Sequence, residues 1–171
     1  MPIEAILLES VVSNFLWAIA KDWLVERRPR RFDFIVETDV GRRIALEVLS
    51  TSPTVRKLHH LKESIKITAS RITEFVLITP DTPSQEDSGR LDEVFADINI
   101  PYRWIGLNEL PEVFGVQSPG DMRTPETIAK IQELALVKNL AGYAKAPVGP
   151  EPRIREQPVA ITNGSDRIKR R

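Results

Sequence analysis

Two acidic residues, Asp33 and Glu47, lie in a stretch of the chain that is otherwise rich in apolar residues. The segment 32–50, FDFIVETDVGRRIALEVLS, predicts two strands joined by a tight turn in which Gly41 can adopt a positive φ. Pairing around this turn places the two acids near one another at the far end of the hairpin. Neighbouring buried carboxylates repel unless a cation or a shared proton lies between them, so the spacing indicates a site for a divalent cation.

Composition restricts the kind of metal that such a site would hold. The 171 residues include no cysteine and only two histidines, His59 and His60. Disulfides, thiolate zinc sites and a catalytic cysteine are therefore excluded, and a His-rich zinc site is not expected. Oxygen ligands suit Mg²⁺, Mn²⁺ or Ca²⁺. Glu9 would add a third oxygen ligand if the first predicted helix covers the same face of the sheet.

Hydrophobic periodicity predicts the elements that must position these acids. We expect helices at residues 3–26, 54–70, 88–97 and 124–141, strands at 32–38, 43–50, 74–80 and 100–107, and a helical turn after the last strand. The core order α-β-β-α-β-α-β predicts an α/β fold with a mixed central sheet flanked by helices. We expect an α/β domain at 1–117, a linker and C-terminal helix at 118–144, and a basic, disordered tail at 145–171.

Charge and hydropathy narrow the classes of partner. Residues 1–26 are apolar, but polar and charged residues interrupt them, and no uncharged run approaches the ~20 residues of a membrane span. With no typical signal peptide, we expect a cytoplasmic protein without a membrane partner. Although the net charge is zero, basic residues cluster before and within the hairpin turn. We expect these arginines to bind a nucleic-acid backbone: Arg27, Arg28, Arg30, Arg31, Arg42 and Arg43.

The arrangement around the two acids resembles the PD-(D/E)XK nuclease superfamily, which includes restriction endonucleases and Holliday-junction resolvases. An Asp on one strand is followed, about a dozen residues later, by a Glu within the apolar run ALEV on the next strand, with a helix before and after. The resemblance covers about residues 1–110. It implies a restriction endonuclease-like fold in which Asp33, Glu47 and Glu9 bind Mg²⁺ or Mn²⁺ and the protein hydrolyses DNA phosphodiester bonds.

The chain departs from this family at the motif lysine. The family places a lysine two residues after the Glu, whereas this chain has Leu49, which cannot orient water or stabilise negative charge at a phosphate. Some members of the family carry the lysine on the next helix instead. The candidates here are Lys57, Lys62 and Lys66, and Lys62, at the border of the apolar stripe, is our predicted catalytic lysine.

Each assignment has a structural alternative. Asp33 would form a surface ion pair with nearby arginines, and Glu47 would face solvent or pair with Arg43 or a lysine of the following helix. Glu9 would be a solvated helix residue, and the arginine cluster a solvated connector. The alternative function is a catalytically inactive nuclease-fold subunit that binds a protein, a second copy or nucleic acid, through the first helix or the 124–141 helix. A small regulator or immunity-type protein is a third class.

Overall fold

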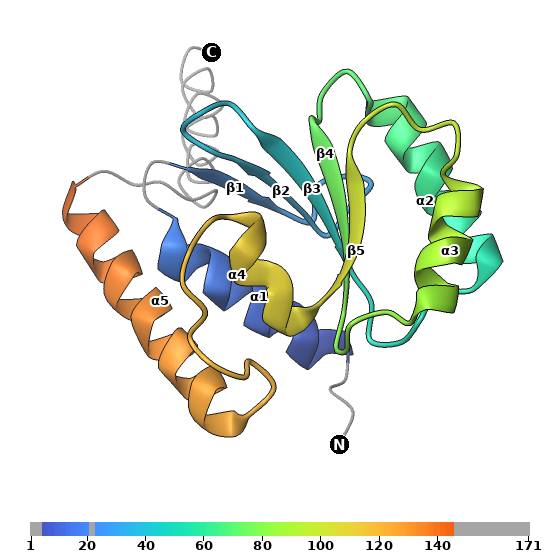
Figure 1. Ribbon diagram of the computed structural model, residues 1–171. Helices are drawn as coiled ribbons and strands as arrows, with labels where there is room; N and C mark the ends of the chain where they lie inside the picture. Colours follow the sequence, from blue (N-terminus) through green and yellow to red (C-terminus); the bar gives the residue numbers. More distant parts are fainter. Residues whose placement is uncertain (1–4, 21–22, 146–171) are drawn as a thin grey trace, which may run out of the picture.

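The computed structural model describes residues 5–20 and 23–145, with side chains described as far as Lys138. Figure 1 shows a central sheet with helices on both faces. The elements in chain order are α1 (Ala5–Ile19), β1 (Leu24–Arg27), β2 (Phe34–Glu37), β3 (Arg43–Val48), α2 (Val55–Thr68), β4 (Glu74–Thr79), α3 (Gln85–Val94), β5 (Tyr102–Gly106), the 3₁₀ turn η1 (Leu107–Glu109), α4 (Leu110–Val113) and α5 (Pro125–Lys145).

The five strands form one mixed sheet in the order β1-β2-β3-β4-β5. The first two pairings are antiparallel, and β3 pairs with β4, and β4 with β5, in parallel. Phe34 faces Leu46 and Glu37 faces Arg43, so the β2–β3 hairpin turns at Gly41, whose φ is +84°. The parallel strands are joined by the crossover helices α2 and α3. The expected α/β fold with a mixed central sheet is confirmed.

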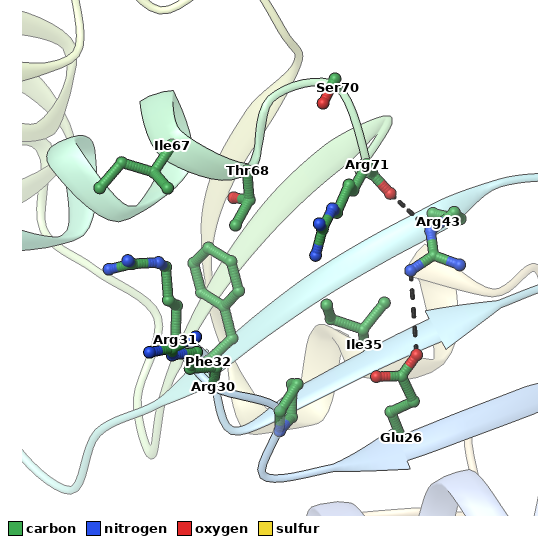
Figure 2. Close-up of a pocket in the computed structure, with 11 residues that line it drawn as sticks. Glu26, Arg30, Arg31, Phe32, Ile35, Arg43, Ile67, Thr68, Ser70 and Arg71 are labelled. Carbon is green, nitrogen blue, oxygen red and sulfur yellow. Dashed lines mark hydrogen bonds and ion pairs between the residues drawn. The ribbon is translucent and has the colours of Figure 1, made fainter.

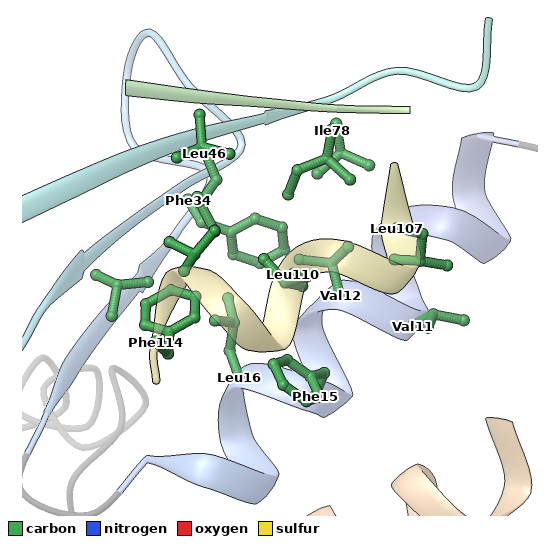
Figure 3. Close-up of a cluster of buried hydrophobic side chains, with 14 of the residues drawn as sticks. Val11, Val12, Phe15, Leu16, Phe34, Leu46, Ile78, Leu107, Leu110 and Phe114 are labelled. Atoms are coloured by element: carbon green, nitrogen blue, oxygen red, sulfur yellow. The ribbon is translucent and has the colours of Figure 1, made fainter. Parts of the chain in front are cut away.

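One face of the sheet packs against α1, η1 and α4, and α5 packs against α1. Phe34 and Leu46 from the hairpin contact the buried side of α1, which includes Val12 and Leu16, as Figure 3 shows. Ile131 of α5 belongs to the same cluster of buried side chains, and α5 packs against α1. The C-terminal helix is therefore part of the core of the α/β domain.

The opposite face packs against α2 and α3. Ala45, Phe75 and Leu77 meet Leu58 and Leu61 of α2 there. Successive residues of a strand point to opposite faces, so Leu46 and Val48 point toward α1 whereas Ala45 and Glu47 point toward α2. This alternation puts the charged side chain of Glu47 in an otherwise apolar row.

The predicted first helix, 3–26, is wrong at its C-terminal end. The structure ends α1 at Ile19, and residues 24–27 form the edge strand β1. The apolar residues Trp23 and Leu24 extend the pattern of the helix, but Leu24 pairs with Glu37 of β2, and Val25 pairs with Val36 and is buried in the sheet. The order therefore contains a strand that the sequence did not indicate.

Other differences concern the ends of elements. The third helix begins at Gln85 rather than 88, because the Ser84 side chain caps it by accepting a hydrogen bond from the Asp87 N–H at 3.1 Å. Of the tail predicted at 145–171, residues 146–171 lie outside the described residues. Among the helices in the described part of the chain, none is long and apolar enough to cross a bilayer.

Candidate carboxylate site

Asp33 immediately precedes β2 and continues its pairing with β3. The Asp33 N–H donates a hydrogen bond to the Leu46 carbonyl at 3.1 Å, and the Asp33 carboxylate oxygen Oδ2 accepts one from the Val48 N–H at 2.7 Å. The side chain thus replaces a backbone carbonyl as the acceptor at the end of the ladder. This contact fixes the Asp33 carboxylate at the open end of the hairpin, opposite Glu47 in the register set by Phe34 and Leu46.

Glu47 lies near the carboxyl end of β3, beneath the first turn of α2. The residue is 7% exposed, and its Oε1 atom lies 3.1 Å from Lys57 Nζ. Lys57 is held in the first turn because Thr54 caps α2, with the Thr54 Oγ1 accepting a hydrogen bond from the Lys57 N–H at 3.1 Å. The sheet register and the helix cap together bring the acid and the lysine into contact. Pairing with a lysine of this helix was one of the structural alternatives for Glu47.

Burial raises the pKa of both carboxyl groups. For Asp33, loss of solvent is the largest cause, the Val48 hydrogen bond opposes it, and the charge of Glu9 raises the pKa further. For Glu47, loss of solvent is again the largest cause, followed by repulsion from Asp33, and the two outweigh the attraction of Lys57. Glu47 therefore lies within the electric field of Asp33, and the nearby positive charges do not fully offset burial and repulsion.

Glu9 lies close to this pair but contacts arginines. Its Oε1 atom accepts a hydrogen bond from Arg28 Nε at 3.0 Å, and Arg27 Nη2 is 3.9 Å away. Within residues 5–20 and 23–145, no group of three acidic or histidine side chains is arranged to hold a metal ion. The expected three-carboxylate set is thus not assembled, and the structure brings together only Asp33 and Glu47.

The lysine selected from the sequence lies elsewhere on α2. Lys62 Nζ is 2.8 Å from Asp97 Oδ1, and Lys66 Nζ is 2.8 Å from Asp97 Oδ2. Lys62 comes five residues after Lys57, which moves it roughly 7.5 Å along the helix and rotates it away from β3. Lys57 therefore occupies the place expected for Lys62. The sequence signal that could have identified Lys57 is the cap at Thr54, because a helix that begins there has its first turn close to the end of β3.

The two arginines of the hairpin turn are held in ion pairs. Arg42 binds Glu74 through two hydrogen bonds, at 3.0 Å and 2.8 Å, and this contact raises the pKa of Arg42. Arg43 contacts Glu37, and its Nη2 atom lies 3.8 Å from Glu26. These guanidinium groups stabilise the sheet. The contacts do not test their expected role in nucleic-acid binding.

The four arginines before the hairpin divide into two pairs. Arg27 and Arg28 face Glu9, and Arg28 has a φ of +54°, in the left-handed region that a residue with a side chain rarely adopts. Arg30 and Arg31 are exposed, and neither forms an ion pair within the described part of the chain. Arg30 and Arg31 are consequently the members of the predicted set that remain open to a ligand.

Comparisons with known proteins assign no family to this arrangement. Neither a comparison with protein-family models nor a search of curated proteins found a match. The buried Glu47, the half-buried Asp33 opposite it and the lysine that pairs with Glu47 lie at the carboxyl end of β3, beside the N-terminus of α2. This is a common position for ligand sites in α/β folds.

Proposed function

We propose that this chain is a metal-dependent nuclease that hydrolyses phosphodiester bonds in DNA with Asp33, Glu47 and Lys57. The observation that carries the proposal is a buried Glu47 and a half-buried Asp33 that face each other with raised pKa values, with Lys57 in contact with Glu47. Acids and bases with perturbed pKa values cluster at functional sites. The acids stand on neighbouring antiparallel segments between α1 and α2, which supports the resemblance to the PD-(D/E)XK superfamily.

The donor atoms of this site fit a hard divalent cation. Asp33 and Glu47 supply carboxylate oxygens, and Mg²⁺ is commonly held by one or two carboxylates together with water and phosphate oxygens. Two acids are therefore sufficient, and Glu9 acts on the site through its charge and its hold on Arg28. When bound, Mg²⁺ or Mn²⁺ would lower the pKa of a water molecule and offset the charge on the phosphate.

The protein side chains have separate roles in this proposal. Lys57 holds a proton at Nζ and donates a hydrogen bond toward a phosphate oxygen, which stabilises the charge that develops as water attacks phosphorus. The N-terminus of α2 favours negative charge at the same place. The Val48 N–H keeps the Asp33 carboxylate in position. The proposal retains the expected cytoplasmic location.

A second function is favoured by a specific observation. Leu49 stands at the position of the motif lysine and packs against the apolar cluster beneath α2, while Lys57 is paired with Glu47. A nuclease fold that has lost catalysis would have these features and would serve as a binding or scaffold subunit. Such a protein would still bind DNA or a protein partner but would not cleave DNA.

Plasmid cleavage separates the two functions. Purified wild-type protein and Lys62→Ala are expected to nick supercoiled DNA in the presence of Mn²⁺, whereas Lys57→Ala should be slower by about 100-fold, the lower end for loss of a positioned proton donor. Lys62→Ala is the matched control, because it changes a lysine of the same helix that contacts Asp97. Equal rates for Lys57→Ala and the wild type would contradict the role of Lys57. No cleavage by the wild type would favour the scaffold function.

A further inference from the structure

A cleft of about 460 Å³ lies on the α2 face of the sheet, between the connector that precedes Asp33 and the C-terminal end of α2. Figure 2 shows its walls: the connector between β1 and β2 on one side and the end of α2 with the following loop on the other. Ile35 of β2 lines the cleft between these walls, and Ile67 of α2 adds a second apolar side chain. The volume falls within the ~300–1,000 Å³ of ordinary ligand pockets.

Positive charge dominates this arginine cleft. Its lining contains Arg30, Arg31, Arg43 and Arg71, with Glu26 as the acidic residue. Arg43 is already bound to acidic residues and to the Arg71 carbonyl. The other three arginines are exposed and form no ion pair within the described residues, and Figure 2 shows the guanidinium of Arg71 directed into the cleft. Such convergence from separate segments creates a field that favours an anion.

The connector that carries Arg30 and Arg31 is anchored at both ends. The Arg28 N–H donates a hydrogen bond to the Asp33 carbonyl at 2.6 Å, which closes the loop. Phe32 is 4% exposed and packs on Phe75 with ring centroids 5.8 Å apart. The two arginines therefore project from a short loop that is already ordered, and an anion would bind without the entropic cost of ordering it.

The connector that lines the cleft leads directly to Asp33 of the carboxylate site, although no residue of that site lines the cleft itself. The connector ends at Asp33, so Arg31 and Phe32 lie next to the proposed reacting centre. The opposite end of the cleft is formed by Thr68 and Arg71, and Thr68 lies roughly 17 Å along α2 from Lys57. This length corresponds to about five nucleotides at the ~3.4 Å rise per nucleotide of a duplex strand.

We propose that the arginine cleft binds the phosphate backbone of one DNA strand a few nucleotides from the bond held at Asp33 and Glu47. This inference rests on the proposed nuclease function, since it takes the ligand to be the strand held at the carboxylates. Arg30, Arg31 and Arg71 would each contact a phosphate, and the apolar side chains of Ile35 and Ile67 would contact sugars or bases. The recognition is electrostatic and independent of base sequence.

Binding of a labelled single-stranded oligonucleotide, followed by fluorescence anisotropy in EDTA, tests the proposal without cleavage. The double variant Arg31→Ala/Arg71→Ala should bind about tenfold more weakly, and the slope of log K against log salt should fall by about 1.4, because each lost phosphate contact contributes about 0.7. Arg103→Ala is the matched control, because Arg103 is an exposed arginine of β5 that does not line the cleft. A mononucleotide is expected not to displace the oligonucleotide.

The possible results separate this inference from the proposed function. Three results would overturn the cleft as a strand site: unchanged affinity and slope in the double variant, an equal loss in Arg103→Ala, or tight displacement by the mononucleotide. Wild-type protein that fails to bind the oligonucleotide would overturn it as well.

Plasmid cleavage by the wild type, together with unchanged oligonucleotide binding by the double variant, would refute the cleft alone. Cleft-dependent binding without any cleavage would refute the nuclease and leave a DNA-binding subunit. Both arginines are exposed, so the variants should melt as the wild type does.

Discussion

Lys57 Nζ lies 3.1 Å from Glu47 Oε1, which joins the first turn of α2 to β3 at the carboxylate site. The lysine reaches this place from the helix, while position 49 on the chain is occupied by a leucine that packs inward. A lysine at position 57 can therefore take the place of one at position 49 beside the Glu47 carboxylate, because the connection between β3 and α2 is short. We therefore expect the charge of Glu47 to affect both the stability of the protein and the binding of a ligand.

Neutralising Glu47 is expected to stabilise the metal-free protein at neutral pH. The pKa of Glu47 is raised in the folded state, so the folded protein holds this proton more tightly than the unfolded chain does. Between the two pKa values stability therefore falls as pH rises, and Glu47→Gln removes this loss. Thermal melts in EDTA from about pH 4 to pH 7 should show the Tm advantage of the variant growing with pH.

The control for this measurement is Glu93→Gln, which changes an exposed acid on α3. Its Tm difference from the wild type should stay nearly constant over the same range. A Tm advantage of Glu47→Gln that shrinks toward neutral pH would mean that the Lys57 contact outweighs burial and repulsion. The pKa of Glu47 would then be lowered rather than raised in the folded protein.

The Arg28→Gly variant is expected to be more stable than the Arg28→Ala variant. Arg28 has a φ of +54°, a conformation that costs residues with a Cβ atom about 1 kcal/mol and glycine almost nothing. Arg28→Gly and Arg28→Ala both remove the contact with Glu9, so their difference isolates the backbone. Urea unfolding should give Arg28→Gly a free energy of unfolding about 1 kcal/mol higher than that of Arg28→Ala. Equal values would show that the loop relaxes to a negative φ.

Removing the cap of α2 is expected to lower both stability and cleavage. Thr54→Ala deletes the acceptor for the Lys57 N–H and should cost about 1 kcal/mol. The first turn that carries Lys57 would fray, so the rate of plasmid nicking should fall by more than the folded fraction does. Thr54→Ser keeps the hydroxyl and serves as the control in both measurements. A stability loss without a change in nicking rate would separate Lys57 from the chemistry.

Local sequence patterns predicted most of the sheet. Apolar runs predicted the buried strands β4 and β5, Gly41 predicted the β2–β3 hairpin, and the segment before the cap predicted the helix α2. These signals act within a few residues of the chain. The strand β1 was not predicted, since Trp23 and Leu24 extend the apolar pattern of the preceding helix. The segment becomes a strand only through pairing with β2, in which Leu24 and Val25 pair with residues more than ten positions away. Tertiary contact decided that segment.

The carboxylates were likewise easier to predict than their partners. Asp33 and Glu47 stood out as charges in apolar strands, and the hairpin register placed them together. The lysine depends on where α2 begins and how it rotates over the sheet, and an apolar stripe alone led to Lys62 rather than Lys57. Arg42 and Glu74 are 32 residues apart, so their ion pair depends on the parallel pairing of β3 with β4.

Isothermal titration of the full chain with Mn²⁺ measures whether Asp33 and Glu47 together form a divalent-cation site. We expect saturable binding of Mn²⁺ by the wild type and its loss in Asp33→Asn, whose side chain still accepts the Val48 hydrogen bond and preserves the fold. Lys62→Ala should bind as the wild type does. No binding by the wild type, or undiminished binding by Asp33→Asn, would contradict the account.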